Sequence, residues 1–224
     1  MKQIIFLFTI VLSLSVTAQK KEKSTQLKPI DSLTTKMVQK RGIITTYLNE
    51  ENKLFFEVDK TVLDKDLLVV TRIAQLPANY SAYLNAGSKT AEQVLRFSKK
   101  GKKIILKQVG YANIADEGDP IALSVAENNF HPILAAFDVK NKEEDRFLID
   151  VSSHFLADSP GFNIIRKGDK ERYKIGSVDK KRSSIDSANS FPKNTEVVHT
   201  LTFSVNKPPR TNRAKTFSFQ INHS

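Results

Sequence analysis

Apolar and polar residues alternate along most of the chain in short runs, which turn-forming residues separate at roughly ten-residue intervals. This pattern begins at Gly42 and is typical of antiparallel β-strands with one buried face. The clearest pair is the hairpin 93–98 and 102–109, in which Gly101 can take the positive φ that a tight turn requires. Further strands are predicted over 42–47, 53–58, 66–74, 132–139, 146–151, 195–205 and 216–221.

Segment 66–74 (DLLVVTRIA) departs from alternation, because its apolar residues are nearly continuous. Such a run predicts a strand that is buried on both faces. Short helical turns are predicted near 31–36, 120–128 and 152–157, and the polar, basic stretch 161–190 predicts a long excursion with one or two short strands. The expected fold is mainly β, with antiparallel sheets in a meander or sandwich-like arrangement and a few short helices.

The first 41 residues have a different character. Residues 1–18 have a basic start, a 13-residue apolar run and the small-residue end Val16-Thr17-Ala18, which together predict a cleaved signal peptide. The apolar run is shorter than the ~20 residues of a transmembrane helix, which disfavours the alternative of an uncleaved anchor. Residues 19–41 are rich in Lys, Ser and Thr, and Pro29 interrupts them, so a linker is predicted before a β-rich domain at 42–224.

The composition shows two further features: the chain has no cysteine, and its basic residues outnumber its acidic ones. The 224 residues include 35 Lys and Arg against 24 Asp and Glu, a net charge of +11, and no Cys. A chain without Cys has no disulfide, no thiol nucleophile, no thiolate metal site and no lipid anchor on cysteine. Export without disulfides suits a bacterial envelope, so we expect a periplasmic, outer-membrane-associated or extracellular protein with no stable membrane insertion after signal cleavage.

The basic residues form clusters that sit in predicted turns or in the linker. They lack interleaved aromatic residues, and export separates the chain from nucleic acid, so nucleic acid is not an expected partner. Weak attraction to anionic envelope components remains an alternative role. The clusters are 20–23, 99–103, 166–174 and 180–182.

No motif with known catalytic or metal-binding chemistry is present. The four histidines, His131, His154, His199 and His223, include no H-E-x-x-H pair. The nearest approach is His154 with Asp158, which would still need a third metal ligand, so His154 is expected to be a surface or capping residue. His199 alternates with apolar neighbours and is expected on the exposed face of its strand.

The acidic stretch Asp116, Glu117 and Asp119 lacks the twelfth-position glutamate of an EF-hand and predicts a solvated turn. There is also no G-x-S-x-G elbow, phosphate-binding loop or G-x-G-x-x-G. The residues therefore predict no catalytic, cofactor-binding or metal-binding site, and an independent enzyme is disfavoured.

Four segments together resemble one known family. They are 53–74, 93–139, 147–162 and 184–205, and their order and spacing resemble the N-terminal domains of unknown function of large secreted bacterial zinc-dependent metallopeptidases. The resemblance runs from about Gly42 to the end of the chain. In that family the peptidase domain with H-E-x-x-H lies downstream, so the resemblance implies that zinc and its ligands belong to that domain and not to this region.

The resemblance also implies that Ser224 is a point of truncation, from a split gene or a fragment, which would expose strand 216–221 at a sheet edge and make the fold marginal. The implied function is a non-catalytic module that packs on or assists a peptidase domain, in cis or in trans. The alternative is a stand-alone exported β-domain that binds envelope glycan, peptide or protein.

Overall fold

The computed structural model describes residues 27–116, 118–141 and 143–224, and these residues form two antiparallel sheets. The large sheet has the order β10-β11-β12-β4-β5-β6-β7, with β9 also paired to β11, and the small sheet has the order β1-β2-β3-β8. The large sheet comprises β4 (Asp66–Gln75), β5 (Lys89–Lys100), β6 (Lys103–Val109), β7 (Ile133–Asp138), β9 (Ile175–Val178), β10 (Ser184–Phe191), β11 (Asn194–Val205) and β12 (Thr216–His223). The small sheet comprises β1 (Val38–Lys40), β2 (Thr45–Leu48), β3 (Leu54–Asp59) and β8 (Arg146–Asp150).

The helices are short. They are α1 (Ile30–Thr34), α2 (Ala122–Asn128), α3 (Ser152–Phe155), α4 (Lys167–Tyr173) and a 3-10 turn at Lys180–Arg182. Among the described residues, no helix has the length and apolar character needed to cross a membrane. The expected mainly β fold with antiparallel sheets and a few short helices is confirmed.

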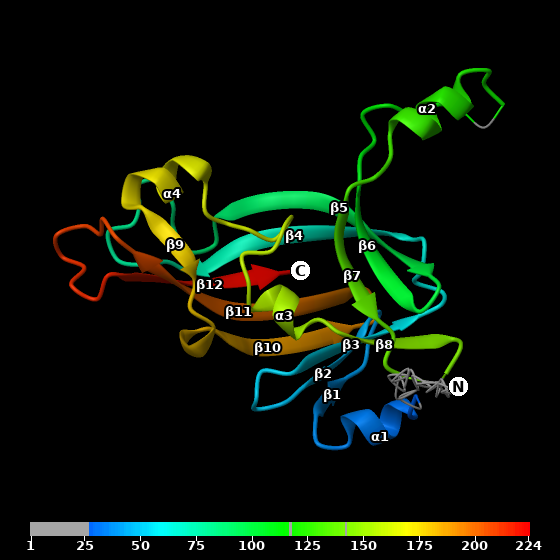
Figure 1. The fold of residues 1–224 in the computed structure, drawn as a ribbon, viewed down its shortest axis with the longest axis horizontal. Helices are drawn as coiled ribbons and strands as arrows, with labels where there is room; N and C mark the ends of the chain where they lie inside the picture. The colour runs from blue at the N-terminus through cyan, green and yellow to red at the C-terminus, as the bar shows by residue number, and fades with distance from the viewer. Residues whose placement is uncertain (1–26, 117, 142) are drawn as a thin grey trace, which may run out of the picture.

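The large sheet curls into a half-barrel, and the small sheet lies beside its open side (Figure 1). At one margin of the small sheet, Thr46 Oγ1 donates to the Ala188 carbonyl of β10 at 3.1 Å. At the other margin, the Lys140 amide donates to the Leu148 carbonyl at 2.9 Å, next to an isolated bridge between Val139 and Ile149. The small sheet therefore spans the gap between the two end strands, β10 and β7, of the curled sheet.

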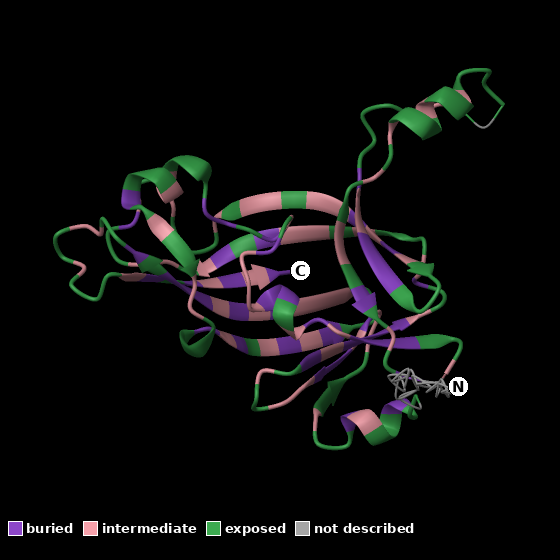
Figure 2. Ribbon diagram, viewed as in Figure 1, coloured by how far each residue is buried: buried purple, intermediate pink, exposed green. Residues whose placement is uncertain are grey.

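Apolar side chains from both sheets form one buried cluster inside the curl. Figure 2 shows buried positions alternating with less buried ones along the strands. The alternation of each strand sends one set of side chains to this interior, as the sequence pattern predicted. A second apolar cluster lies at the far end of β11 and β12, where Tyr80 and Tyr173 pack on Phe217. Ring centroids in this cluster are 5.1–5.4 Å apart with near-perpendicular planes, an arrangement that aromatic pairs favour.

The small sheet also contains one buried carboxylate, Glu57, which two neighbouring strands satisfy. Tyr47 Oη donates to Glu57 at 2.6 Å, and Arg146 Nη1 donates to it at 3.0 Å. Burial, followed by the hydrogen bond to Glu57, raises the pKa of Tyr47 above its usual range, so the phenol remains a donor. This network joins β2, β3 and β8.

Strand β12 occupies a different place from the one its sequence position suggested. It is paired with β11 over eight residue positions and with β4 on its other edge. The expectation of an exposed edge at 216–221 is therefore wrong, and the expectation of a marginal fold loses its physical basis.

Strand β4 also differs from expectation, because its faces alternate in burial and Leu68 is 59% exposed. Only one face of this sheet is covered along β4.

The predicted linker at 19–41 is structured over its described part, and residues 19–26 lie outside the described residues. Residues 27–41 contain α1 and β1, and β1 pairs with β2. The Ile30 side chain is fully buried with Tyr47 and Leu148. The polar composition hid this element because only Ile30, with the partly buried Leu33 and Met37, anchors it to the sheet.

Replacing Ile30 by alanine tests whether α1 belongs to the fold. We expect Ile30→Ala to lower the free energy of unfolding by about 2–5 kcal/mol, because it leaves a cavity in a closed cluster. Val38→Ala, at a 64% exposed position of β1, is the matched control and should cost less than about 1 kcal/mol. Urea unfolding measures both, and equal small effects would show that residues 27–41 contribute little to the fold.

Candidate functional site

Three of the four histidines meet inside the half-barrel. His199 of β11 and His223 of β12 face the interior, and His154 of α3 approaches them from the segment that covers the concave face. Their side chains are 1%, 4% and 8% exposed, respectively. The expectations of a surface His154 and an exposed His199 are therefore wrong, because α3 covers the face of β11 on which His199 lies.

A short chain of hydrogen bonds links two of these imidazoles to β4. His199 Nε2 lies 3.0 Å from His223 Nε2, and His223 Nδ1 lies 2.9 Å from Thr71 Oγ1. The two rings are stacked, with centroids 5.1 Å apart. When both rings are neutral, one of the two facing Nε2 atoms must carry a hydrogen and donate it in the hydrogen bond, and the other must be the acceptor. One ring is therefore protonated at Nε2 and the other at Nδ1.

Burial makes all three imidazoles weak bases. It lowers the pKa of His154 to about 4, and of His199 to about 4, where the Phe155 carbonyl acts in the opposite direction. The pKa of His223 is also well below its ordinary value because of burial and the neighbouring His199. The cluster is therefore neutral at physiological pH, which its surroundings of Phe155 and Phe162 favour.

A cavity of about 90 Å³ lies against this cluster. Its lining is mostly apolar, from β3 to β7 and β11, and includes His154, His223 and Phe162. His154 Nε2 and His199 Nδ1 have no hydrogen-bond partner among the described residues. The cavity is small against the ~300–1,000 Å³ of common ligand pockets, so it can take a side-chain-sized apolar group and not a whole cofactor.

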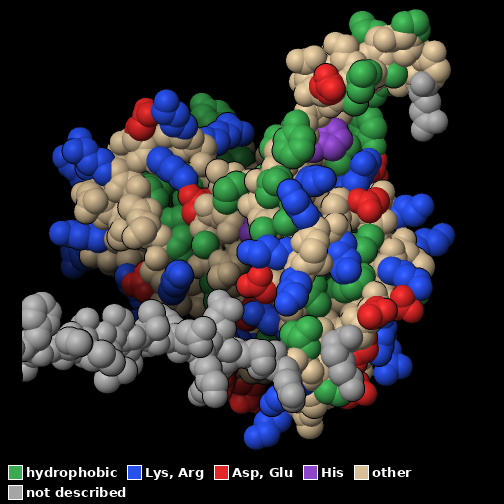
Figure 3. Space-filling model, turned by 45° about the vertical axis from the view of Figure 1, so that its right-hand side comes forward, with side chains coloured by type: hydrophobic (Ala, Val, Ile, Leu, Met, Phe, Trp, Pro, Cys, Tyr) green, Lys and Arg blue, Asp and Glu red, His purple; other side chains and the backbone are tan. Residues whose placement is uncertain are grey.

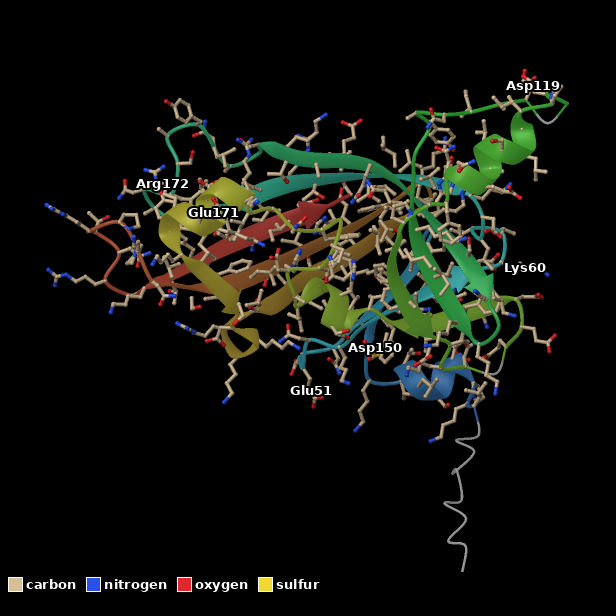
Figure 4. The ribbon with its side chains drawn as sticks, turned by 45° about the horizontal axis from the view of Figure 1, so that its top comes forward. Glu51, Lys60, Asp119, Asp150, Glu171 and Arg172 are labelled. Atoms are coloured by element: carbon tan, nitrogen blue, oxygen red, sulfur yellow. The ribbon has the colours of Figure 1, made fainter. Side chains whose placement is uncertain are left out.

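The histidines are not arranged as a metal centre. Among the described residues, no group of three or more His, Asp or Glu side chains is placed to hold a metal ion. His154 and Asp158, the pair considered from the sequence, do not face a shared site: Asp158 instead forms an ion pair with Lys170. Acidic residues such as Glu51, Asp119, Asp150 and Glu171 lie on separate parts of the molecule (Figure 4).

The acidic stretch at 116–119 forms a turn in which the Asp119 amide donates to the Asp116 carbonyl at 2.9 Å. Glu117 lies outside the described residues. Of the basic clusters, 99–103 is the β5–β6 turn, 166–174 is centred on α4, and 180–182 is the 3-10 turn; 20–23 lies outside the described residues.

A second candidate site is an arm that projects from the body of the molecule. The arm consists of residues 110–132, between β6 and β7, and carries α2 (Figure 1). No residue of α2 is buried. Large apolar side chains are nevertheless exposed along the arm: Tyr111, Ile114, Ile121, Leu123 and Phe130, at 55–75%.

These side chains gather on the arm and where it joins the body (Figure 3). Under the arm is a hollow of about 370 Å³, lined by Tyr111, Phe130 and His131 from the arm and by Arg96 and Lys107 from the sheet. The hollow therefore combines aromatic surface with the ammonium of Lys107, while Arg96 is paired with Asp66. Sequence analysis predicted the helix at 120–128 but not its projection.

Comparison with known proteins assigns the two parts of the chain to two families. Residues 87–224, more than half of the chain, match the family described as Domain of unknown function (DUF5117). The chain belongs to the DUF5117 family. Residues 27–76 match Domain of unknown function (DUF5118). No curated protein and no solved structure matches the chain.

The histidine cluster predicts an acid-sensitive DUF5117 fold. Since the folded-state pKa values lie below the ordinary 6.5, the unfolded chain binds protons first as pH falls. The three neutral histidines therefore contribute fully to the free energy of unfolding above about pH 6.5, and this contribution is lost as the pH falls toward 4. The slope is up to about 4 kcal/mol per pH unit when three protons are taken up. His154→Phe should reduce that slope by about 1.4 kcal/mol per pH unit. Urea unfolding between pH 7 and 4.5 measures it; an unchanged slope would contradict burial of a neutral His154.

Proposed function

We propose that this chain is a non-catalytic module of an exported zinc-dependent metallopeptidase and that it packs on or assists a peptidase domain supplied in cis or in trans. The observation that carries the proposal is the arm at 110–132, whose large apolar side chains are exposed. The segment order that resembles the N-terminal domains of such peptidases supports the identity of the partner. Zinc belongs, on this proposal, to the partner domain.

The exposed apolar side chains of the arm have no role in the chain's own core. Ile114 and Leu123 are 75% and 71% exposed, and neither contributes to the buried clusters. Apolar side chains gathered on one projecting element mark protein interaction sites, because their burial by a partner removes them from water. Tyr111 and Phe130 add the aromatic surface that anchors many interfaces.

The hollow under the arm determines which chemical groups of a partner fit this surface. Lys107 contributes an ammonium group to its floor, and Arg96, which bonds Asp66, lies beside it. A partner that inserts an apolar side chain against Phe130 would place an acidic neighbour within reach of Lys107. The proposed peptidase domain therefore presents an apolar patch with an acidic rim.

Export follows from the signal-peptide pattern at 1–18, which lies outside the described residues. We place the protein in the periplasm, at the outer membrane or outside the cell. The alternative, a stand-alone exported β-domain that binds glycan, peptide or protein, uses the same fold without a peptidase partner. This alternative would be favoured if the gene has no neighbouring reading frame that encodes H-E-x-x-H.

Arm variants test the docking surface. In affinity purification from the native host, we expect the chain to retain a polypeptide that contains H-E-x-x-H, identified by mass spectrometry. Ile114→Glu with Leu123→Glu should weaken its retention by at least about tenfold, because two charges enter an apolar interface. The matched control is Tyr83→Ser, at a 93% exposed position in the β4–β5 loop. Equal retention by both variants would exclude the arm as the docking surface.

A casein assay tests the non-catalytic assignment separately. The purified chain should leave casein intact with or without added zinc, and zinc-dependent cleavage should accompany the retained polypeptide. Cleavage by the chain alone that a chelator abolishes would show that the chain is itself a peptidase.

A further inference from the structure

One edge of β7 is left without a strand partner. In the described part of the chain, β7 pairs with β6 alone, and the bridge between Val139 and Ile149 lies just beyond its end. After that bridge β7 and β8 diverge, and the chain that follows β8 turns into α3. An unpaired edge exposes main-chain donors and acceptors that another strand can complete.

The register of β7 identifies which backbone groups face that edge. The Val139 amide donates to the Lys102 carbonyl at 3.0 Å, and Phe137 lies opposite Ile104. Since alternate residues of an antiparallel strand direct their amides to opposite sides, the N–H and C=O of Ala136 point away from β6. Ala136 is exposed, and no described residue outside the ladder hydrogen-bonds to its backbone.

A groove of about 420 Å³ runs along this edge. One wall is β7, from Leu134 to Asp138, and the other is formed by Ser153, Ser159 and Pro160. The chain after Pro160 closes against β7: a Cβ on Gly161 would lie 2.7 Å from Leu134 Cδ1, and Gly161 has a φ of +77°. The positive φ favours glycine there, and Gln93 Nε2 donates to the Gly161 carbonyl, which ties this wall to the sheet.

Two side chains connect this groove with the interior. His154 and Phe137 line both the groove and the 90 Å³ cavity behind it. The His154 imidazole is buried, neutral, and has an Nε2 atom without a partner among the described residues. The floor of the groove therefore offers an apolar recess and one free hydrogen-bonding atom.

We propose that this groove binds an extended peptide segment, which adds to the edge of β7 as a further strand and exchanges main-chain hydrogen bonds with Ala136. One apolar side chain of the peptide packs against the edge-to-face pair of Phe137 and His154 at the floor of the groove. Charges on the rim are largely compensated, because Asp138 pairs with Lys103 at 3.5 Å, half-buried Asp150 accepts from the Ser152 amide at 3.0 Å, and Lys140 adds one ammonium, so the apolar floor and not charge selects the peptide. This is strand addition, in which the main chain supplies affinity and the pocket supplies specificity.

This site is separate from the arm and does not depend on the docking of a peptidase domain. Failure of the arm variants would leave the groove unaffected, and loss of peptide binding would leave the docking proposal unaffected.

The test measures binding of a fluorescein-labelled acetyl-Lys-Thr-Val-Thr-Val-Lys-amide to the chain by fluorescence anisotropy. We expect saturable binding, and at least about tenfold weaker binding to Ala136→Pro, which removes the edge donor without removing a β6 ladder bond. Ala136→Val, which keeps the donor, is the matched control and should bind as the unmodified chain does. Two versions of the peptide carry N-methyl groups on alternate amides: the version that blocks the amides facing β7 should bind at least about tenfold more weakly, and the version that blocks the amides facing solvent should bind as the unmodified peptide does.

Two results would overturn the proposal: no saturable binding of the peptide, or binding that Ala136→Pro and both N-methylated versions leave unchanged. If Ala136→Pro does not fold, as judged by circular dichroism, hydrogen exchange on the unmodified chain decides. The Ala136 amide should exchange at least about tenfold more slowly with saturating peptide, and an unchanged rate would exclude strand addition at β7.

Discussion

The pairing of β12 with β11 on one side and β4 on the other holds the whole sheet together. β4 lies in the segment that matches DUF5118, and β12 and β5 lie in the segment that matches DUF5117. The two family segments therefore share one continuous hydrogen-bonded ladder and do not form two independent sheets. The other strands of the large sheet, from β10 to β7, are joined to β12 directly or through neighbouring strands. The curl of the sheet therefore depends on the two pairings of β12.

A curled sheet creates a concave face that must be filled with side chains. The small sheet covers part of that face, and α3 covers the remainder with His154 and Phe155. His199 and His223 then lie in an environment that stabilises only their neutral forms. The same covering that completes the core makes the fold sensitive to acid, because protonation would place a charge where water does not reach.

The surfaces that remain after this packing are the ones that suggest function. The arm between β6 and β7 carries apolar side chains that the core does not use, and β7 itself keeps one edge unpaired. Both features belong to one connected segment of the chain, β6 to α3, whereas β12 and β4 lie at the centre of the sheet. The projecting arm and, in the described part of the chain, the open edge of β7 are the features on which the two proposals rest.

Sequence alone determined the features that depend on local pattern. Alternation located β5, β6 and β11, Gly101 at a φ of +59° closes the predicted hairpin, and the short helices α2 and α3 lie where they were expected. Tertiary structure decided which faces are covered. His199 alternates as a surface residue would, yet α3, which is distant in sequence, buries it, and β12 is last in the chain but central in the sheet. Periodicity reports how side chains point from one strand, whereas burial depends on which distant segments pack against that face, and no local pattern specifies that pairing.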